Sequence, residues 1–206
     1  AAIADFNGDG LVDVVVPGEI GSSYRAFLNL GGWFFIDVSP VAGCGSSTLA
    51  KMCAPADYDN DGDLDLFVCV RNGPSRLLQN NGMMMFTDVG PAAGLAFVDE
   101  SFHASWGDYD RDGFLDLYVS VRHMSETLAP NRLFHNNGDG TFTDVTVASG
   151  TAHNCLTFAS MWFDYDSDGW PDLFVTSDVA FNDARPGNSL YRNNGDGTFT
   201  DVGATV

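Results

Sequence analysis

The sequence contains very little positive charge. Lys51 is the only lysine among 206 residues, the eight arginines are scattered, and the formal net charge is −19. Binding to nucleic acid or to anionic lipid depends on clustered lysine and arginine, so we expect neither as a partner. Hydrophobic runs are also short: none approaches the roughly 20 residues of a membrane-spanning helix, and we expect no membrane insertion.

The sequence also lacks the patterns of helices, of secretion signals and of N-glycosylation. No stretch has a sustained apolar period of about 3.6 residues, which argues against helices. The chain has no initiator methionine, no signal peptide and no Asn-x-Ser/Thr acceptor. We therefore expect a mature or excised segment without N-glycans.

Cysteines are few, and their spacing is not that of a zinc site. None of the four forms a Cys-x-x-Cys or Cys/His pattern. Cys44 and Cys53 flank a short loop, where a disulfide and a pair of thiols are equally open interpretations. Cys69 lies in a hydrophobic run and is expected to be buried, while Cys155 has no obvious partner.

A nine-residue acidic loop occurs four times, starting at residues 5, 57, 108 and 164. Each copy has oxygen-bearing side chains at loop positions 1, 3, 5 and 9 and glycine at position 6, a pattern that wraps a hard cation. Four carboxylates so close together repel one another unless a divalent ion neutralises them. The pattern predicts about four Ca²⁺ sites, with these ligands: Asp5, Asn7, Asp9, Asp13; Asp57, Asp59, Asp61, Asp65; Asp108, Asp110, Asp112, Asp116; Asp164, Asp166, Asp168, Asp172. Asn7 replaces an aspartate, so the first site is expected to bind more weakly.

The acidic residues are concentrated in these loops. The loops hold 16 of the 28 acidic residues, and only three of the 28 are glutamates. Four Ca²⁺ ions would bring the net charge to about −11. Sites of weak to moderate affinity suit the millimolar calcium outside cells, so we expect an extracellular or cell-surface protein.

The loops recur at spacings of 52, 51 and 56 residues. A period near 50 in a strand-rich chain is typical of propeller blades. Each repeat contains an inner strand, the acidic loop, a second strand, a connection, a third strand, a turn and an outer strand. The prediction is an all-β fold: one propeller region over 1–206, with four blades of four antiparallel strands at about 1–40, 41–91, 92–147 and 148–206. An EF-hand is excluded, because its position-12 glutamate is replaced by valine in every copy.

The fuller repeat resembles a known family. Its residues 107–119 (Gly-Asp-Tyr-Asp-Arg-Asp-Gly-Phe-Leu-Asp-Leu-Tyr-Val) and 131–145 (Asn-Arg-Leu-Phe-His-Asn-Asn-Gly-Asp-Gly-Thr-Phe-Thr-Asp-Val) are similar to FG-GAP/VCBS repeats of integrin alpha-subunit propellers, bacterial secreted proteins and the UnbV/cartilage acidic protein group. The resemblance implies that loop aspartates hold Ca²⁺. It also implies about seven blades, so four blades form either a closed ring or, as we favour, an arc with open edges.

Two surfaces differ between the repeats. Trp33, Phe34, Met83, Met84 and Met85 stand at the hairpin tips of the first two blades, where they either form an apolar partner site or fold back onto the blades. On the opposite face, the connections at 123–130 and 178–187 are longer than in the first two blades. They are either a binding surface or tolerated loop variation.

Signals for catalysis are weak. His103 is expected to pack within an inner strand, His135 to represent surface variation, and His123 and His153 to lie in loops without a nucleophile motif. Metal ligation already accounts for the paired aspartates.

The sequence therefore predicts a calcium-stabilised extracellular propeller that is not an enzyme. We expect a structural or recognition module for adhesion or for a protein or glycan partner. The alternatives are a self-associating subunit of a filament or surface layer, and an accessory domain of a larger secreted enzyme.

Overall fold

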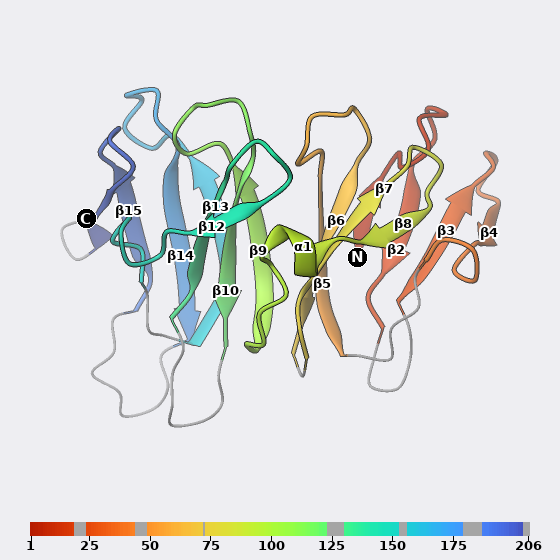
Figure 1. The fold of residues 1–206 in the computed structure, drawn as a ribbon, viewed down its shortest axis with the longest axis horizontal. Helices are drawn as coiled ribbons and strands as arrows, with labels where there is room; N and C mark the ends of the chain where they lie inside the picture. Colours follow the sequence, from red (N-terminus) through yellow and green to blue (C-terminus); the bar gives the residue numbers. More distant parts are fainter. Residues whose placement is uncertain are drawn as a thin grey trace. The chain divides into compact units, whose positions relative to one another are not determined.

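The computed structural model describes residues 1–18, 24–43, 49–71, 73–122, 130–152, 156–178 and 187–203. The chain divides into two compact units, Ala1–Asp99 (the N-terminal unit) and Glu100–Val206 (the C-terminal unit). Each unit contains two four-stranded sheets (Figure 1). Four predictions concern residues outside the described ranges: those on Cys44, on Cys155, on the loop histidines 123 and 153, and on most of the connections 123–130 and 178–187.

The N-terminal unit contains the first two blades. Its first sheet consists of β1 (Ala2–Ala4), β2 (Asp13–Val16), β3 (Arg25–Asn29) and β4 (Phe35–Asp37). Its second consists of β5 (Ala50–Ala56), β6 (Asp65–Val70), β7 (Arg76–Asn80) and β8 (Phe86–Asp88), followed by the single-turn helix α1 (Gly90–Ala93). In both sheets each strand pairs antiparallel with the next.

The C-terminal unit repeats this arrangement. Its first sheet consists of β9 (Ser101–Gly107), β10 (Asp116–Val121), β11 (Arg132–Asn136) and β12 (Phe142–Asp144). Its second consists of β13 (Leu156–Phe163), β14 (Asp172–Asp178), β15 (Ser189–Asn193) and β16 (Phe199–Asp201). The order within each sheet follows the chain, so the predicted fold class, all-β with four antiparallel four-stranded blades, is confirmed. The choice between a ring and an arc concerns the two units together and stays a prediction.

Helix is almost absent from the described residues. Only α1 is α-helical there; it has a proline in its first turn, and Gly94 ends it in the left-handed conformation that glycine adopts readily. None of the described helical structure is long and apolar enough to span a bilayer.

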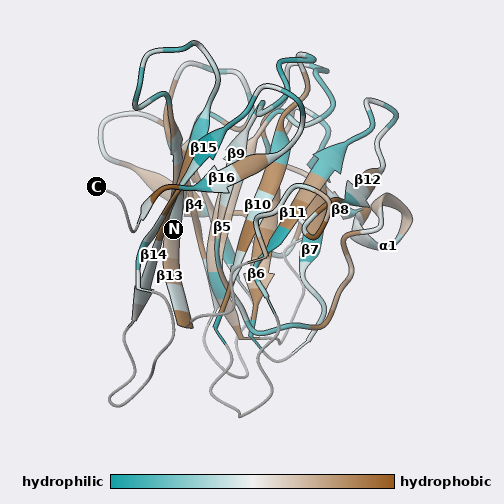
Figure 2. Ribbon diagram, turned by 90° about the vertical axis from the view of Figure 1, so that its left-hand side faces the viewer, coloured by the Kyte–Doolittle hydropathy of each residue, from teal (hydrophilic) through white to brown (hydrophobic). Residues whose placement is uncertain are grey.

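The core of each unit lies where one sheet packs face to face on the next. In the N-terminal unit, Val15 and Ala26 of the first sheet share a buried cluster with Leu66, Val68 and Leu78 of the second. The strands contain most of the hydrophobic residues, whereas the acidic loops are hydrophilic (Figure 2).

The C-terminal unit has an equivalent core. Tyr118 of β10 packs with Leu173 and Val175 of β14, and the Trp162 ring stacks on Tyr109 with centroids 6.4 Å apart.

Candidate metal sites

Each acidic loop joins the first and second strands of its sheet. The four loops connect β1 to β2, β5 to β6, β9 to β10 and β13 to β14. Within each unit the two loops leave their sheets at the same end (Figure 1). The repeated sequence therefore builds the same local structure four times.

Backbone hydrogen bonds to aspartate close each loop. In the second loop, Asp57 Oδ1 accepts the N–H of Asp61 at 3.1 Å and Asp57 Oδ2 accepts that of Gly62 at 3.0 Å. Asn60 and Gly62 have left-handed backbones, with φ of 59° and 94°, which explains the glycine at position 6. The other three loops make the same pair of bonds from their first aspartate.

The aspartate at position 9 is buried and fastens the loop to the third strand. Asp65 Oδ2 accepts the N–H of Tyr58 at 3.4 Å, and its Oδ1 accepts the N–H of Asn80 at 2.7 Å. The same two acceptor contacts recur in the other blades, at Asp13, Asp116 and Asp172. These predicted ligands thus also have a structural role, because both oxygens already bind backbone N–H groups.

The environment of the loops disfavours negative charge. Burial, the largest cause, raises the pKa of Asp65 and of Asp116, and together with nearby aspartates brings it to about 7. Burial also raises the pKa of Asp59 and Asp110 at loop position 3. A bound cation would reverse this effect by favouring the ionised carboxylates.

The residues present fit a divalent cation. Asp59 Oδ1 and Asp110 Oδ1 are buried, and within the described ranges neither has a hydrogen-bond partner of normal geometry. Buried oxygens without partners are costly unless an ion or water binds them. Carboxylate oxygens also come within 4.8 Å of one another in three sets: Asp57, Asp59 and Asp61; Asp108, Asp110 and Asp116; Asp164, Asp166 and Asp172.

The first loop differs from the others. Asn7 Nδ2 donates a hydrogen bond to Asp9 Oδ2 at 3.0 Å, so a neutral amide stands where the other loops have a carboxylate. Fewer charged ligands lower the affinity for Ca²⁺, and the weaker first site stays a prediction.

Sequence reasoning missed an asparagine at the end of every third strand. Asn80 Nδ2 donates to the carbonyl oxygens of Phe6 at 2.7 Å and Leu64 at 3.1 Å, and Asn193 makes the equivalent bonds to Tyr109 and Pro171. The sequence does contain a signal for this role, because asparagine recurs at the same place in all four repeats: Asn29, Asn80, Asn136 and Asn193.

In the second and third blades, the residue before this asparagine lies against the acidic loop. Gln79 Nε2 donates to Asp59 Oδ2 at 2.7 Å. His135 Nδ1 lies 3.2 Å from both Asp110 Oδ2 and Asp116 Oδ1. The interpretation of His135 as surface variation was therefore wrong, because the register of the third strand places its side chain beside the loop.

The predicted partner-contact residues separate into two groups. Trp33, Phe34, Met83 and Met85 are exposed, with Trp33 95% accessible. Met84 is only 3% accessible and belongs to the core, which corrects its placement on an exposed patch. Its backbone is left-handed (φ 59°), and its side chain packs with the buried residues of the two sheets instead of facing solvent.

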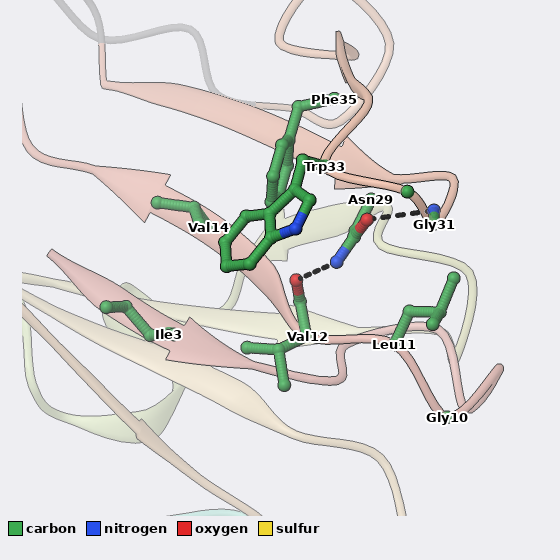
Figure 3. A pocket seen from close by; sticks show the side chains of 10 residues that line it. Ile3, Gly10, Leu11, Val12, Val14, Asn29, Gly31, Trp33 and Phe35 are labelled. Carbon is green, nitrogen blue, oxygen red and sulfur yellow. Dashed lines mark hydrogen bonds between the residues drawn. The ribbon is translucent and has the colours of Figure 1, made fainter.

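Trp33 borders a hollow on the first blade. The hollow has a volume of about 530 Å³ and is lined mainly by hydrophobic side chains, including Ile3, Val14 and Phe35. Figure 3 shows Asn29 beside it, donating to Val12 O and accepting from the Gly31 N–H, both at 2.9 Å.

The remaining candidate residues, one histidine and two cysteines, lie away from the acidic loops. His103 is half-buried, its Nδ1 accepts a hydrogen bond from the backbone nitrogen of Ser160 at 3.4 Å, and burial lowers its pKa. Cys69 is a buried thiol whose pKa is raised well above its usual value by burial, as in an unreactive core residue. Cys53 is buried in β5, and its disulfide with Cys44 stays a prediction.

Sequence comparison identifies relatives of these repeats. The family model of the FG-GAP-like repeat matches residues 5–68, 57–119, 124–175 and 164–206. Cartilage acidic protein 1 is 27% identical over 146 residues in Mus musculus and 29% identical over 148 residues in Homo sapiens. Each alignment covers 66% of this chain and 22% of the relative, so the chain spans a minor part of those proteins.

Solved structures share the fold at low sequence identity. A lectin from Agrocybe aegerita, solved for its recognition of non-reducing terminal N-acetylglucosamine, aligns with a TM-score of 0.58 and 22% identity, over 97% of this chain and 50% of the lectin chain. An exotype rhamnogalacturonan lyase aligns with a TM-score of 0.50 and 16% identity, over 96% of this chain and 37% of the lyase chain.

Proposed function

Because this chain belongs to the FG-GAP-like repeat family, we propose that it is a calcium-stabilised binding module of an extracellular β-propeller, without enzymatic activity. The observation that carries the proposal is the loop geometry. Four loops share one backbone design, three of them bring carboxylate oxygens within 4.8 Å of one another, and two contain buried carboxylate oxygens without a normal hydrogen bond.

Calcium would be held by the side chains at loop positions 1, 3 and 5, together with the buried position-9 aspartate. The ion supplies positive charge where burial now opposes ionisation. Each loop continues from the inner strand at one end, and at the other end its position-9 aspartate accepts a hydrogen bond from the third strand. Because the loop connects these strands, binding the ion stabilises the whole blade.

Thermal unfolding in calcium and in chelator tests this role. We expect a markedly higher melting temperature in millimolar CaCl₂ than in EGTA, because the ion binds the folded loops and not the unfolded chain. The same comparison in MgCl₂ controls for ionic strength and general divalent screening. Equal melting temperatures in all three buffers would contradict the calcium role.

The partner class is a protein or a glycan. The exposed hollow beside Trp33 offers an aromatic face with a polar neighbour, Asn29, a combination suited to the apolar face and hydroxyl groups of a sugar. The lectin with the same fold supports testing glycans first. We expect immobilised glycans to retain the wild-type chain in calcium but not Trp33→Ala; equal retention of both proteins, or no retention, would contradict this choice of site and partner class.

A second candidate function, self-association, is favoured by the exposed face of the first blade. The pairing of β2, β3 and β4 makes Val16 and Phe35 the counterparts of Val68 and Phe86. Val68 and Phe86 are 0% and 6% exposed in the packed second blade, whereas Val16 and Phe35 are 40% and 38% exposed. The first blade therefore presents the face that the second blade buries against a neighbouring sheet.

The oligomeric state tests this candidate. We expect the chain to associate in calcium through this face, because covering apolar side chains is favourable. Light scattering should show a larger species for the wild type and a monomer for Val16→Ser combined with Phe35→Ser. Thr87→Ser on the second blade is a matched surface control. A monomeric wild type, or a double variant that still associates, would contradict it.

A further inference from the structure

The hollow on the first blade corresponds to a place that an aromatic ring fills in two other blades. In the N-terminal unit, Phe6 at position 2 of the first loop packs edge to face on Phe86 of the second blade, with ring centroids 5.8 Å apart. In the C-terminal unit, Tyr109 at position 2 of the third loop packs on Phe199 of the fourth blade, with centroids 5.7 Å apart. Phe6 and Tyr109 are 1% and 5% exposed. A ring from one acidic loop therefore packs into the blade that follows it in the chain.

The first blade has the same place, open to solvent. Phe35 is the first residue of β4, as Phe86 is of β8 and Phe199 of β16. Phe35 lines the hollow together with Val14 and Ile3 (Figure 3). It is 38% exposed, whereas Phe86 and Phe199 are 6% and 7% exposed. The hollow therefore has the apolar lining that receives a position-2 ring in the second and fourth blades.

The asparagine beside the hollow has an N–H available for a further bond. Asn80 Nδ2 and Asn193 Nδ2 each donate to two carbonyls, one in their own blade and one at position 2 of the preceding blade's loop. Within the described ranges, Asn29 Nδ2 donates only to Val12 O of its own blade. Its second N–H is thus available to the position-2 carbonyl of another blade, and a hydrogen bond there would fix how that blade docks.

The fourth blade presents a matching ring. Tyr165, at position 2 of the fourth loop, is 37% exposed, whereas Phe6 and Tyr109 at the same loop position are buried. Met161 and Phe163 lie on one side of β13, because side chains two apart in a strand point the same way, and they are 53% and 41% exposed. The fourth blade therefore offers an exposed apolar face with an aromatic ring beside it.

Side-chain sizes on the two open faces also match. Trp162 of the fourth blade lies so close to Gly107 of the third that a Cβ on Gly107 would be 2.6 Å from its Cγ. The fourth blade has the large Phe163 at the position of Gly107. The first blade has Ile3, smaller than tryptophan, at the position of Trp162. A first blade is thus a better neighbour for Phe163 than a blade with tryptophan, which would be overpacked there.

We propose that the hollow of the first blade receives the Tyr165 ring of a second copy of this chain, with Asn29 donating to the Tyr165 carbonyl, so that copies associate head to tail. The contact joins two different faces, so further copies can add at both ends. This inference rests on the self-association proposed above and names the surface that the first blade binds. The alternative is a symmetric contact in which the first blades of two copies meet.

Variants of the two faces separate these arrangements. Phe35→Arg blocks the hollow and keeps the fourth-blade face, whereas Tyr165→Arg blocks the fourth-blade face and keeps the hollow. Met161→Arg is a second variant of the fourth-blade face that leaves the acidic loop unchanged. Val147→Arg, at a residue of the third blade that is 84% exposed, is the matched control. Sedimentation velocity in calcium measures each protein alone and in equimolar pairs, and circular dichroism checks that each is folded.

We expect wild type and Val147→Arg to form species that grow with concentration. Association should weaken at least about tenfold in Phe35→Arg, in Tyr165→Arg and in Met161→Arg. An equimolar mixture of Phe35→Arg and Tyr165→Arg should form a dimer, because the mixture contains one intact hollow and one intact fourth-blade face. A mixture that stays monomeric, or fourth-blade variants that associate like wild type, would overturn the inference.

The outcomes also separate this inference from the proposed function. If Phe35→Arg is monomeric and Tyr165→Arg still associates, the first blade remains the self-association face and its proposed partner is wrong. A monomeric wild type would overturn both self-association and this inference, while the melting temperatures in calcium and chelator would still decide the calcium role. Tyr165→Arg keeps the hollow open, so its retention on immobilised glycans tests the glycan role independently.

Discussion

Asn80 Nδ2 donates a hydrogen bond of 2.7 Å to the backbone carbonyl of Phe6, 74 residues earlier in the chain. Phe6 is position 2 of the first acidic loop, and Asn80 ends the third strand of the second blade. The bond therefore links a metal loop of one blade to the sheet of the next. Asn193 makes the same bond to Tyr109 at 2.8 Å in the C-terminal unit.

Replacing Asn80 by alanine should destabilise the protein by about 1–3 kcal/mol, because the carbonyls of Phe6 and Leu64 lose their buried donor. Urea unfolding in calcium measures this free energy. Thr87→Ala, an exposed position in the adjacent strand, is the matched control and should change the free energy of unfolding by less than about 0.5 kcal/mol. Equal effects of the two substitutions would contradict the role of Asn80.

Stability without metal should fall as the pH rises. The pKa of Asp65 and of Asp116 is about 7 in the folded protein, against a reference value of 3.8. Between these values the folded state binds more protons than the unfolded state, so the free energy of unfolding decreases with increasing pH. This contribution is complete below about pH 4 and is lost by about pH 7.

Calcium should cancel this loss, since it binds the ionised carboxylates. The measurement is urea unfolding at about pH 5 and about pH 8, in chelator and in calcium. We expect lower stability at the higher pH in chelator only. A metal-free protein that is more stable at the higher pH would show that burial does not govern these carboxylates.

Much of the fold could be predicted from the sequence because its signals are local. The acidic loop contains its own turn, with an aspartate that accepts backbone N–H groups four and five residues later and glycine at the left-handed position 6. A period near 50 then predicted repeated blades, which the four sheets confirm. The predicted resemblance to FG-GAP repeats is also confirmed.

The parts of the site that were missed depend on contacts between distant segments. His135 meets Asp116 and Asp110 only through the pairing of the third strand with the second, which sets which side chains face the loop. Asn80 reaches Phe6 because two sheets pack together. Neither the strand register nor the packing of sheets can be read from a nine-residue motif.

The three consecutive methionines should differ sharply in their contribution to stability. Met84 is 3% exposed and packs in the core of the N-terminal unit, whereas Met83 is 68% exposed. Met84→Ala should lower the free energy of unfolding by about 2–5 kcal/mol, because it leaves a cavity between the first two sheets. Met83→Ala, the matched control in the same turn, should change it by less than about 0.5 kcal/mol.

Urea unfolding of both variants in calcium measures the difference. Binding and association assays on the same proteins then distinguish core packing from partner contact: an exposed residue that contacts a partner affects association without affecting folding. Met84→Ala with wild-type stability and weakened association would restore Met84 to a partner surface. A large loss of stability confined to Met84→Ala would leave Met83 and Met85 as the residues of this turn available to a partner.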